Sequence, residues 1–324
     1  MNPTEPKTDV PKVSVALVTY NHARYIAQAI ESVLSQRTAF PIEIVIGEDC
    51  STDGTRKIVK DYAARHPELI TALLHSRNLG RSGDGNFLAV LAACRGDYVA
   101  LLDGDDYWTH HTKLQAQADY LDRHSEVVGC FHNAIVVDHD GLTVKSEHYD
   151  APLRREHWYG SRFTQADCLT LLRSAYPTCS LVFRRSALGH LPDWFMASPS
   201  DYALDLLLTE HGDLAYLPKS IGAYRIHSGG VWQGRPLIEN YLEIFQRLTV
   251  LLQAPELRGK HESALLRELR DYALRINHLS RVERHILDLR YLRDSFRYVY
   301  DRRSTYRLIG EQLLRRLHRR LPKA

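Results

Sequence analysis

Four short apolar runs, the first two rich in β-branched residues, alternate with amphipathic segments between residues 13 and 102. Runs of this length are typical of buried strands, and the segments between them repeat their apolar residues at helical spacing. Strands and helices that alternate in this way form a parallel sheet with helices packed across it. We therefore predict an α/β fold with a mostly parallel sheet flanked by helices. The predicted strands are residues 13–18, 42–46, 70–74 and 98–102.

Asn21 stands after the first of these runs, where it is placed to cap the following helix. Residues 142–175 are rich in charged and aromatic side chains and show no clean period, as expected of a loop region that faces an acceptor. Further elements are predicted as a helix over residues 114–121, strands over 127–137, 180–183 and 214–217, and a helix over 200–210.

The chain has 324 residues, enough for a catalytic domain with an appendage. From Leu237 onward leucines recur at helical spacing and glycine and proline become scarce, which predicts a C-terminal helical extension. The expected organisation is a flexible N-terminus over residues 1–11, an α/β catalytic domain over 12–235 and a helical region over 236–324.

The sequence shows neither the features expected of a secretory signal nor those of a membrane-spanning helix. The first dozen residues are polar and contain prolines without an apolar core, unlike a secretory signal. No apolar stretch approaches the roughly 20 residues that cross a bilayer. The five cysteines are widely spaced with no CxxC pair, which fits a reducing compartment. We predict a cytoplasmic protein, and the formal charge of +3 is too small to indicate nucleic acid as a partner.

Acidic residues follow two of the predicted strands. Glu48 and Asp49 come after the second run, and the fourth ends in Asp103-Gly104-Asp105-Asp106. In parallel sheets, ligands bind beyond the carboxyl ends of the strands, so these carboxylates should meet on one rim. They would repel one another without a cation, and Mg²⁺ or Mn²⁺ under a diphosphate is the natural counter-charge. A plain polar turn is the alternative interpretation of the acidic run.

Four motifs in this order closely resemble glycosyltransferase family 2 over about residues 12–232. They are the stretch from Val15 to Asn21, the run from Ile44 through Glu48-Asp49-Cys50-Ser51-Thr52-Asp53-Gly54-Thr55, Arg77-Asn78-Leu79-Gly80, and Gly96-Asp97-Tyr98 through Leu101-Leu102-Asp103-Gly104-Asp105-Asp106-Tyr107-Trp108. The resemblance implies the Rossmann-like GT-A fold and inversion of configuration at the transferred sugar.

The resemblance also implies roles for individual residues on the nucleotide side. Thr19, Tyr20 and Asn21 match residues that line the nucleotide pocket. Asp49 matches the carboxylate that reads the imide of a uracil or thymine base, although a helix cap is its alternative role. Glu48 stands where the family often has another Asp. Apart from the resemblance, Arg77 and Arg81 are candidates for contact with phosphate, and a solvated charge at a helix edge is the alternative role of either.

On the sugar side, Asp103 and Asp105 match the two ends of the DxD motif, which contacts the ribose and the metal on the diphosphate. Gly104 lies between them, and Asp106 matches the position beside the sugar. His227, in a Tyr-Arg-Ile-His-Ser-Gly-Gly segment, matches a histidine that can reach the metal or the diphosphate. A structural hydrogen-bonding role is its alternative.

Inverting transfer needs a carboxylate that takes the proton of the acceptor hydroxyl. Asp201 resembles the base of the family's Glu-Asp motif, but Ser200 replaces the Glu here. Asp205, one helical turn later, is the alternative base, and the remaining carboxylate then simply favours the helix N-terminus.

The last 24 residues carry eight basic side chains against two acidic ones, with leucines between them. A basic amphipathic helix of this kind can lie on an anionic membrane surface, here the inner face of the cell membrane. Packing of the leucines on the domain or on a second subunit, as in a homo-oligomer, is the alternative.

The predicted function is thus inverting, metal-dependent transfer of a sugar from a UDP- or dTDP-sugar to a hydroxyl of a glycan or lipid-linked acceptor. Cell-surface polysaccharide assembly is the expected setting. Two alternatives stay open: a nucleotidyltransferase acting on a sugar phosphate, and a non-catalytic membrane or nucleic-acid binder. The first normally has a Gly-rich phosphate loop that this chain lacks after its first strand, and the second leaves the strand-end carboxylates unexplained.

Overall fold

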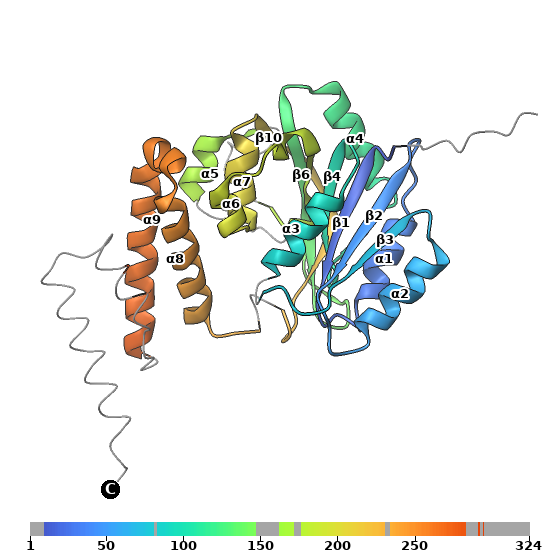
Figure 1. Cartoon of the computed structure of the whole chain (residues 1–324), viewed down its shortest axis with the longest axis horizontal. Coiled ribbons are helices and arrows are strands. Elements are labelled where there is room, and N and C mark those ends of the chain that lie inside the picture. Colours follow the sequence, from blue (N-terminus) through green and yellow to red (C-terminus); the bar gives the residue numbers. More distant parts are fainter. Residues whose placement is uncertain are drawn as a thin grey trace, which may run out of the picture. The chain divides into compact units, whose positions relative to one another are not determined.

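The computed structural model describes residues 10–80, 83–146, 162–171, 176–230 and 234–282, together with Tyr291 and Asp294. Residues 1–9, Arg81 and the basic tail over 301–324 lie outside the described residues. The chain divides into two compact units, with the division between Gly229 and Gly230. The first unit holds the α/β sheet, and the second is helical (Figure 1).

Four parallel strands form the first half of the sheet in the order β3-β2-β1-β4. Most apolar side chains of β1, β2 and β4 are almost completely buried, as the predominantly hydrophobic sequences of these strands predict. The strands are β1 (Val13–Thr19), β2 (Ile42–Glu48), β3 (Ile70–Leu74) and β4 (Tyr98–Asp103).

Three helices connect these strands: α1 (Ile26–Leu34), α2 (Thr55–Arg65) and α3 (Asp84–Ala93). The chain steps outward from β1 to β3 and then returns to place β4 on the other side of β1. Because such crossovers are right-handed, α1 and α2 lie on one face of the sheet and α3 on the other. Accordingly α1 contacts α2, whereas α3 packs on β1 and β2 (Figure 1).

The second half of the sheet is mixed and follows in the order β9-β6-β10-β5. Strands β6 and β10 run parallel to each other, while β9 is antiparallel to both β4 and β6. The strands are β5 (Tyr107–Trp108), β6 (Val127–Val137), β7 (Thr143–Lys145), β8 (Arg162–Phe163), β9 (Val182–Arg184) and β10 (Asp213–Arg225). The helices here are α4 (Lys113–Arg123), α5 (Gln165–Leu171), α6 (Asp193–Ala197) and α7 (Asp201–Thr209).

Several local predictions need correction. Helix α1 begins at Ile26 with Tyr25 at the N-cap position, so Asn21 does not cap it. The strand predicted at 214–217 continues to Arg225 as β10, because its parallel pairing with β6 extends past two irregularities. The strand predicted at 180–183 begins later, at Val182, after a short 3₁₀ turn. The region 142–175 contains the short elements β7, β8 and α5 in its described part.

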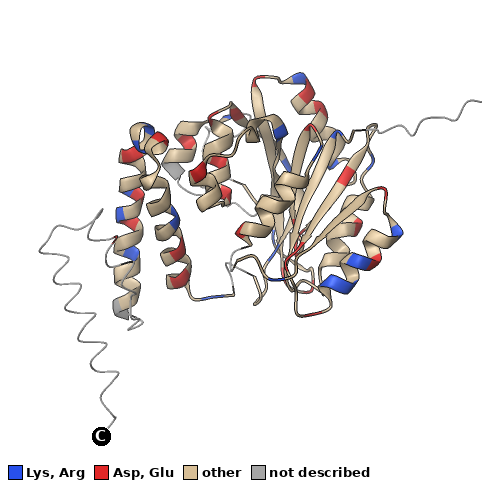
Figure 2. Ribbon diagram, in the orientation of Figure 1, with Lys and Arg blue, Asp and Glu red and all other residues tan. Residues whose placement is uncertain are grey.

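The second unit consists, in its described part, of helices α8 (Leu237–Gln253) and α9 (Pro255–Val282), which pack against each other. Acidic and basic residues are interspersed along both helices (Figure 2). Several form i,i+4 pairs, such as Arg258 with Glu262 and Arg275 with Asp271. Of the helices in the described ranges, none is both long and apolar enough to span a bilayer.

Candidate active site

The sheet reverses its strand order between β1 and β4, which is where open α/β sheets bind ligands. Register brings the ends of the three neighbouring strands level, with Thr19 opposite Glu48 and Val18 opposite Asp103. The acidic segments predicted to share one rim therefore do so, and Figure 2 shows acidic positions gathered at this end of the strands.

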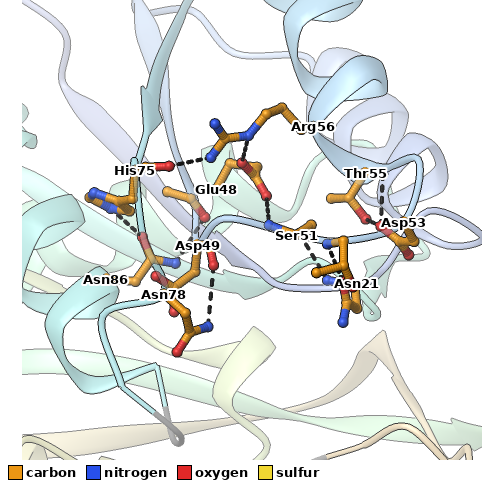
Figure 3. A network of polar contacts seen from close by, with 12 residues as sticks. Asn21, Glu48, Asp49, Ser51, Asp53, Thr55, Arg56, His75, Asn78 and Asn86 are labelled. Atoms are coloured by element: carbon orange, nitrogen blue, oxygen red, sulfur yellow. Dashed lines mark hydrogen bonds and ion pairs between the residues drawn. The ribbon is translucent and has the colours of Figure 1, made fainter.

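Asp49 lies just beyond β2 and is only 1% exposed. Its Oδ1 accepts a hydrogen bond from the backbone N–H of Leu79 (2.8 Å), and its carbonyl accepts one from Asn78 Nδ2 (3.2 Å; Figure 3). Within the described part of the chain, no donor reaches its buried Oδ2. Burial, reinforced by the charge of Glu48, raises the pKa of Asp49. One carboxylate oxygen is thus held by the protein, while the other accepts no hydrogen bond from the described residues.

Glu48 is fully buried and does not point to open space. Its Oε1 accepts a hydrogen bond from the N–H of Ser51 (2.6 Å), and its Oε2 is paired with the guanidinium of Arg56 (Figure 3). Arg56 also donates to the carbonyl of His75. These bonds tie the turn after β2 to the first turn of α2 and to the end of β3, so Glu48 holds the loop that carries Asp49.

Asn21 and Cys50 both adopt the left-handed backbone region, with φ of 56° and 59°. Asn tolerates this conformation better than most residues, whereas Cys does not, and such strain is common where ligands bind. Asn21 Oδ1 accepts from the N–H of Thr52 (2.8 Å), while Asn21 N–H donates to Ser51 Oγ (3.0 Å; Figure 3). Asn21 therefore joins the ends of β1 and β2 instead of capping α1.

The remaining nucleotide-side positions differ in exposure. Thr19 is buried, whereas Tyr20 is 43% exposed beside it. Arg77 is exposed in the loop after β3, the same loop whose Asn78 and Leu79 bond Asp49. Arg81 cannot be placed because it lies outside the described residues.

The acidic run is enclosed and electrostatically strained. Burial, then the charges of Asp105 and Asp201, raise the pKa of Asp103 well above its usual range. Burial, then the charges of Asp105 and Asp103, do the same to the pKa of Asp106. Asp106 Oδ1 accepts from the N–H of Arg225 (2.8 Å). A divalent cation would relieve this mutual repulsion.

Gly104 is required by the closeness of the strand ends. A Cβ at this position would stand 2.5 Å from Thr19 Oγ1 and 3.0 Å from His22 Nδ1. Only glycine allows the backbone between Asp103 and Asp105 to approach the end of β1 so closely.

Asp105 faces two histidines. His227 Nε2 lies 3.0 Å from Asp105 Oδ2, and His22 Nε2 lies 3.6 Å from the same oxygen. One ligand atom from each of these three side chains lies within 4.8 Å of the others, which makes them a candidate metal site among the described residues. Asp103 is not part of this cluster. Burial acts to raise the pKa of Asp105, but the charges of His22 and His227 outweigh it and lower that pKa; burial lowers the pKa of His22.

Two residues in this site received no role from sequence reasoning. His22 belongs to the polar segment after β1, and its position at a strand end was the available signal. Arg225 ends β10 and is 4% exposed. Its guanidinium donates to the carbonyls of Asp105 (2.8 Å) and Asp138 (2.9 Å) and to Gln28 Oε1 (2.7 Å). A strand predicted to stop at residue 217 could not have placed Arg225 there.

The two candidate bases occupy different environments. Asp201 is the first residue of α7, half-buried, and accepts a hydrogen bond from Thr178 Oγ1 (3.1 Å). Thr178 belongs to the 3₁₀ turn Thr178–Ser180, which packs against β4, the strand that ends in Asp103. The charge of Asp201 contributes to the raised pKa of Asp103. Asp205 is fully buried and accepts a hydrogen bond from the hydroxyl of Tyr176. Asp201 therefore borders the acidic run from the second half of the sheet, whereas Asp205 is enclosed.

Comparison with known proteins gives a family model, sequence relatives and solved structures that are similar to this chain. The family model described as Glycosyl transferase family 2 matches residues 14–191. An uncharacterised protein of Mycobacterium tuberculosis is 39% identical over 221 residues, covering 68% of this chain and 60% of that protein. An uncharacterised glycosyltransferase of Nostoc sp. is 32% identical over 225 residues, covering 67% of this chain and 65% of its own. The chain thus spans less than two thirds of the length of these curated relatives.

Among solved structures, S. aureus TarS 1-349 in complex with UDP-GlcNAc is similar with a TM-score of 0.59. The match covers 94% of this chain and 89% of that chain at 17% identity. At this level of identity the similarity establishes a shared fold.

Proposed function

The chain belongs to glycosyltransferase family 2, and from this we propose that it transfers a sugar from a nucleotide diphosphate donor to a hydroxyl group of an acceptor. The observation that carries the proposal is the gathering of Asp49, the acidic run and Asp201 around the switch point between β1 and β4. One rim of the sheet would thereby bind the nucleobase, the diphosphate and the acceptor of a single reaction.

The donor is a uridine or thymidine diphosphate sugar in this proposal. Uracil and thymine present an imide N–H, and the buried Oδ2 of Asp49 is an acceptor without a protein donor in the described chain. Leaving a buried acceptor unmatched costs about 1–3 kcal/mol, which a base N–H would recover. Asn21 and the Glu48–Arg56 pair hold the loop in place, and Tyr20 and Arg77 are exposed beside it.

A divalent cation fits the sugar side of the site. Asp105 and His227 offer an oxygen and a nitrogen ligand for such an ion. The nearby carboxylates repel one another, as the raised pKa of Asp103 indicates, and a cation would offset this repulsion. When bound, the ion would supply Lewis-acid stabilisation of the departing diphosphate. Arg225 keeps Asp105 and Asp106 in position through its bonds to both residues.

Asp201 is proposed as the general base that takes the proton of the acceptor hydroxyl. Its side chain is partly exposed next to the acidic run, while that of Asp205 is sealed behind Tyr176. A base must come within hydrogen-bond reach of the acceptor, which favours the exposed carboxylate. Inversion at the sugar carbon would follow from attack opposite the departing diphosphate. A glycan or lipid-linked acceptor and a role in polysaccharide assembly stay predictions.

Thermal unfolding of the full chain with a panel of nucleotide sugars and Mn²⁺ tests the proposal. A donor that binds the native state stabilises it by about 2.7 kcal/mol at a hundred times its dissociation constant. We expect UDP- or dTDP-sugars to raise the melting temperature, and the shift to vanish with EDTA or in Asp105→Ala. A panel without any shift, or a shift that survives chelation, would contradict it.

A further inference from the structure

The cluster of His22, Asp105 and His227 contains one histidine more than the sequence motifs assign to the metal. We propose that His22 is a third protein ligand of the donor-side cation, so that the ion meets two imidazoles and one carboxylate and the site prefers Mn²⁺ to Mg²⁺. This inference rests on the proposed function and specifies the metal chemistry of the same site.

The position of His22 is fixed by bonds at both of its backbone groups. Its N–H donates to Thr55 Oγ1 (2.8 Å), and its carbonyl accepts from the N–H groups of Tyr25 and Ile26 (both 2.8 Å). The next N–H, that of Ala23, donates to Asp53 Oδ2 (3.0 Å). The start of α2 therefore anchors the segment from which the imidazole projects, as a preorganised ligand requires.

The side chain is directed at Asp105 without completing a hydrogen bond to it. The 3.6 Å between His22 Nε2 and Asp105 Oδ2 exceeds hydrogen-bond length, while His227 Nε2 lies at 3.0 Å from that oxygen. His22 Nδ1 is also buried, and no described residue donates to it or accepts from it. The three side chains are 15%, 17% and 7% exposed in chain order, so the group is shielded yet reachable.

The spacing suits a common ion. Imidazole and carboxylate ligands bind first-row ions at about 2.1 Å, so their ligand atoms stand about 3–4 Å apart. Separations of 3.0 and 3.6 Å, with all three atoms within 4.8 Å, need only a small inward movement. His227 is braced by the ring of Tyr25, whose centroid lies 4.8 Å away, and Arg225 holds the carbonyl of Asp105.

Ligand chemistry then selects the metal. Mg²⁺ takes oxygen ligands and keeps several waters, whereas imidazole nitrogens suit first-row transition ions. A set with two nitrogens and one carboxylate lowers the affinity for Mg²⁺ relative to Mn²⁺. Without His22, the remaining Asp and His would discriminate less between the two ions.

The test measures metal binding directly on the full chain. Mn²⁺ is titrated alone and with UDP while EPR follows the signal of the free aqueous ion, and Mg²⁺ is then added as competitor. We expect His22→Gln to weaken Mn²⁺ binding by about tenfold or more, as loss of a metal-site residue commonly does, with a smaller effect on Mg²⁺. The exposed His190→Gln is the matched control and should leave both affinities unchanged.

Pulsed EPR of bound Mn²⁺ separates ligation from a structural role, because imidazole ¹⁴N couplings report nitrogens at the ion. Wild type should show two such nitrogens, and His22→Gln and His227→Gln one each. Unchanged ¹⁴N couplings in His22→Gln, equal losses of Mn²⁺ and Mg²⁺ affinity, or no Mn²⁺ binding by wild type with UDP present would each overturn the inference. If UDP-sugar transfer persists in those cases, the proposed function stands. If Mn²⁺ coordination depends on His22 but no nucleotide sugar binds, the proposed function fails instead.

Discussion

At the scale of single residues, two carboxylates divide the proposed reaction between them. Asp201 is half-buried at the start of α7, and Asp49 is sealed beyond β2 with one oxygen committed to Leu79. Because one is assigned to proton transfer and the other to base recognition, their variants should fail in different measurements.

Asp201→Asn should retain donor binding and lose transfer. The amide keeps the size of the side chain but cannot take a proton, and general-base catalysis contributes about 10²–10⁴-fold in rate. Turnover is measured by release of nucleoside diphosphate, and binding of UDP by calorimetry. Asp205→Asn is the comparison: if it abolishes turnover with an unchanged melting temperature while Asp201→Asn does not, the base lies one helical turn later.

Asp49→Asn should change the preferred base. The amide oxygen can keep the bond from the N–H of Leu79, which leaves an NH₂ group where Oδ2 stood. Two N–H donors then face each other when uracil binds, so UDP affinity should fall by about 10–100-fold, or 1–3 kcal/mol. Cytosine presents an acceptor at the same ring position, so CDP should gain relative to UDP. Parallel losses for both nucleotides in calorimetry would argue against base reading by Asp49.

At the scale of elements, a buried ion pair stabilises the loop between β2 and α2. Glu48 and Arg56 form a pair in which Glu48 is fully buried, and the same loop carries Asp49 and the left-handed Cys50. A buried carboxylate without a partner cation destabilises the folded state, so this pair connects the stability of the loop to the geometry of the proposed nucleotide site.

Arg56→Ala should therefore weaken UDP binding indirectly, because Arg56 holds the loop through Glu48 and is not proposed to contact the nucleotide. Glu48 would be left buried without its cation, at a cost of roughly 3–5 kcal/mol, and the turn would loosen. Lys57→Ala is the matched control, because Lys57 is the next residue and its pair with Asp61 is exposed. Calorimetry with UDP and thermal unfolding report the two effects, and equal behaviour of the two variants would exclude this role for the loop.

At the scale of the whole molecule, folding encloses a lysine that sequence patterns alone do not identify as buried. Lys113, at the start of α4, is completely buried, and its Nζ lies 4.1 Å from the ring centroid of Trp108. Burial lowers its pKa from 10.5 to about 7. Between about pH 7 and pH 10.5, Lys113 is therefore protonated in the unfolded chain and neutral in the folded protein.

Stability should consequently rise with pH in this window, since the unfolded state holds more protons there. Compared with Lys113→Met, the free energy of unfolding of wild type should increase by about 2 kcal/mol between pH 7 and pH 9. Below pH 7 both states are protonated and the difference should level off. Urea unfolding followed by Trp fluorescence measures this, with the exposed Lys60→Met as control, and parallel pH curves for wild type and Lys113→Met would contradict the prediction.

The parallel half of the sheet and the meeting of the acidic segments on one rim could be predicted from the amino-acid sequence, and the motifs indicated the family and its GT-A fold. These follow from local causes: buried parallel strands are continuous apolar runs, and their carboxyl ends must share an edge. Contacts between residues far apart in the sequence emerged only from the folded structure. In the fold, Glu48 pairs with Arg56 and Asn21 bonds to Thr52. Strand β10 extends along β6 as far as Arg225, and His22 lies near Asp105 and His227. Each of these contacts joins residues on different strands or loops, and the free energy of such contacts depends on packing that periodicity and composition do not encode.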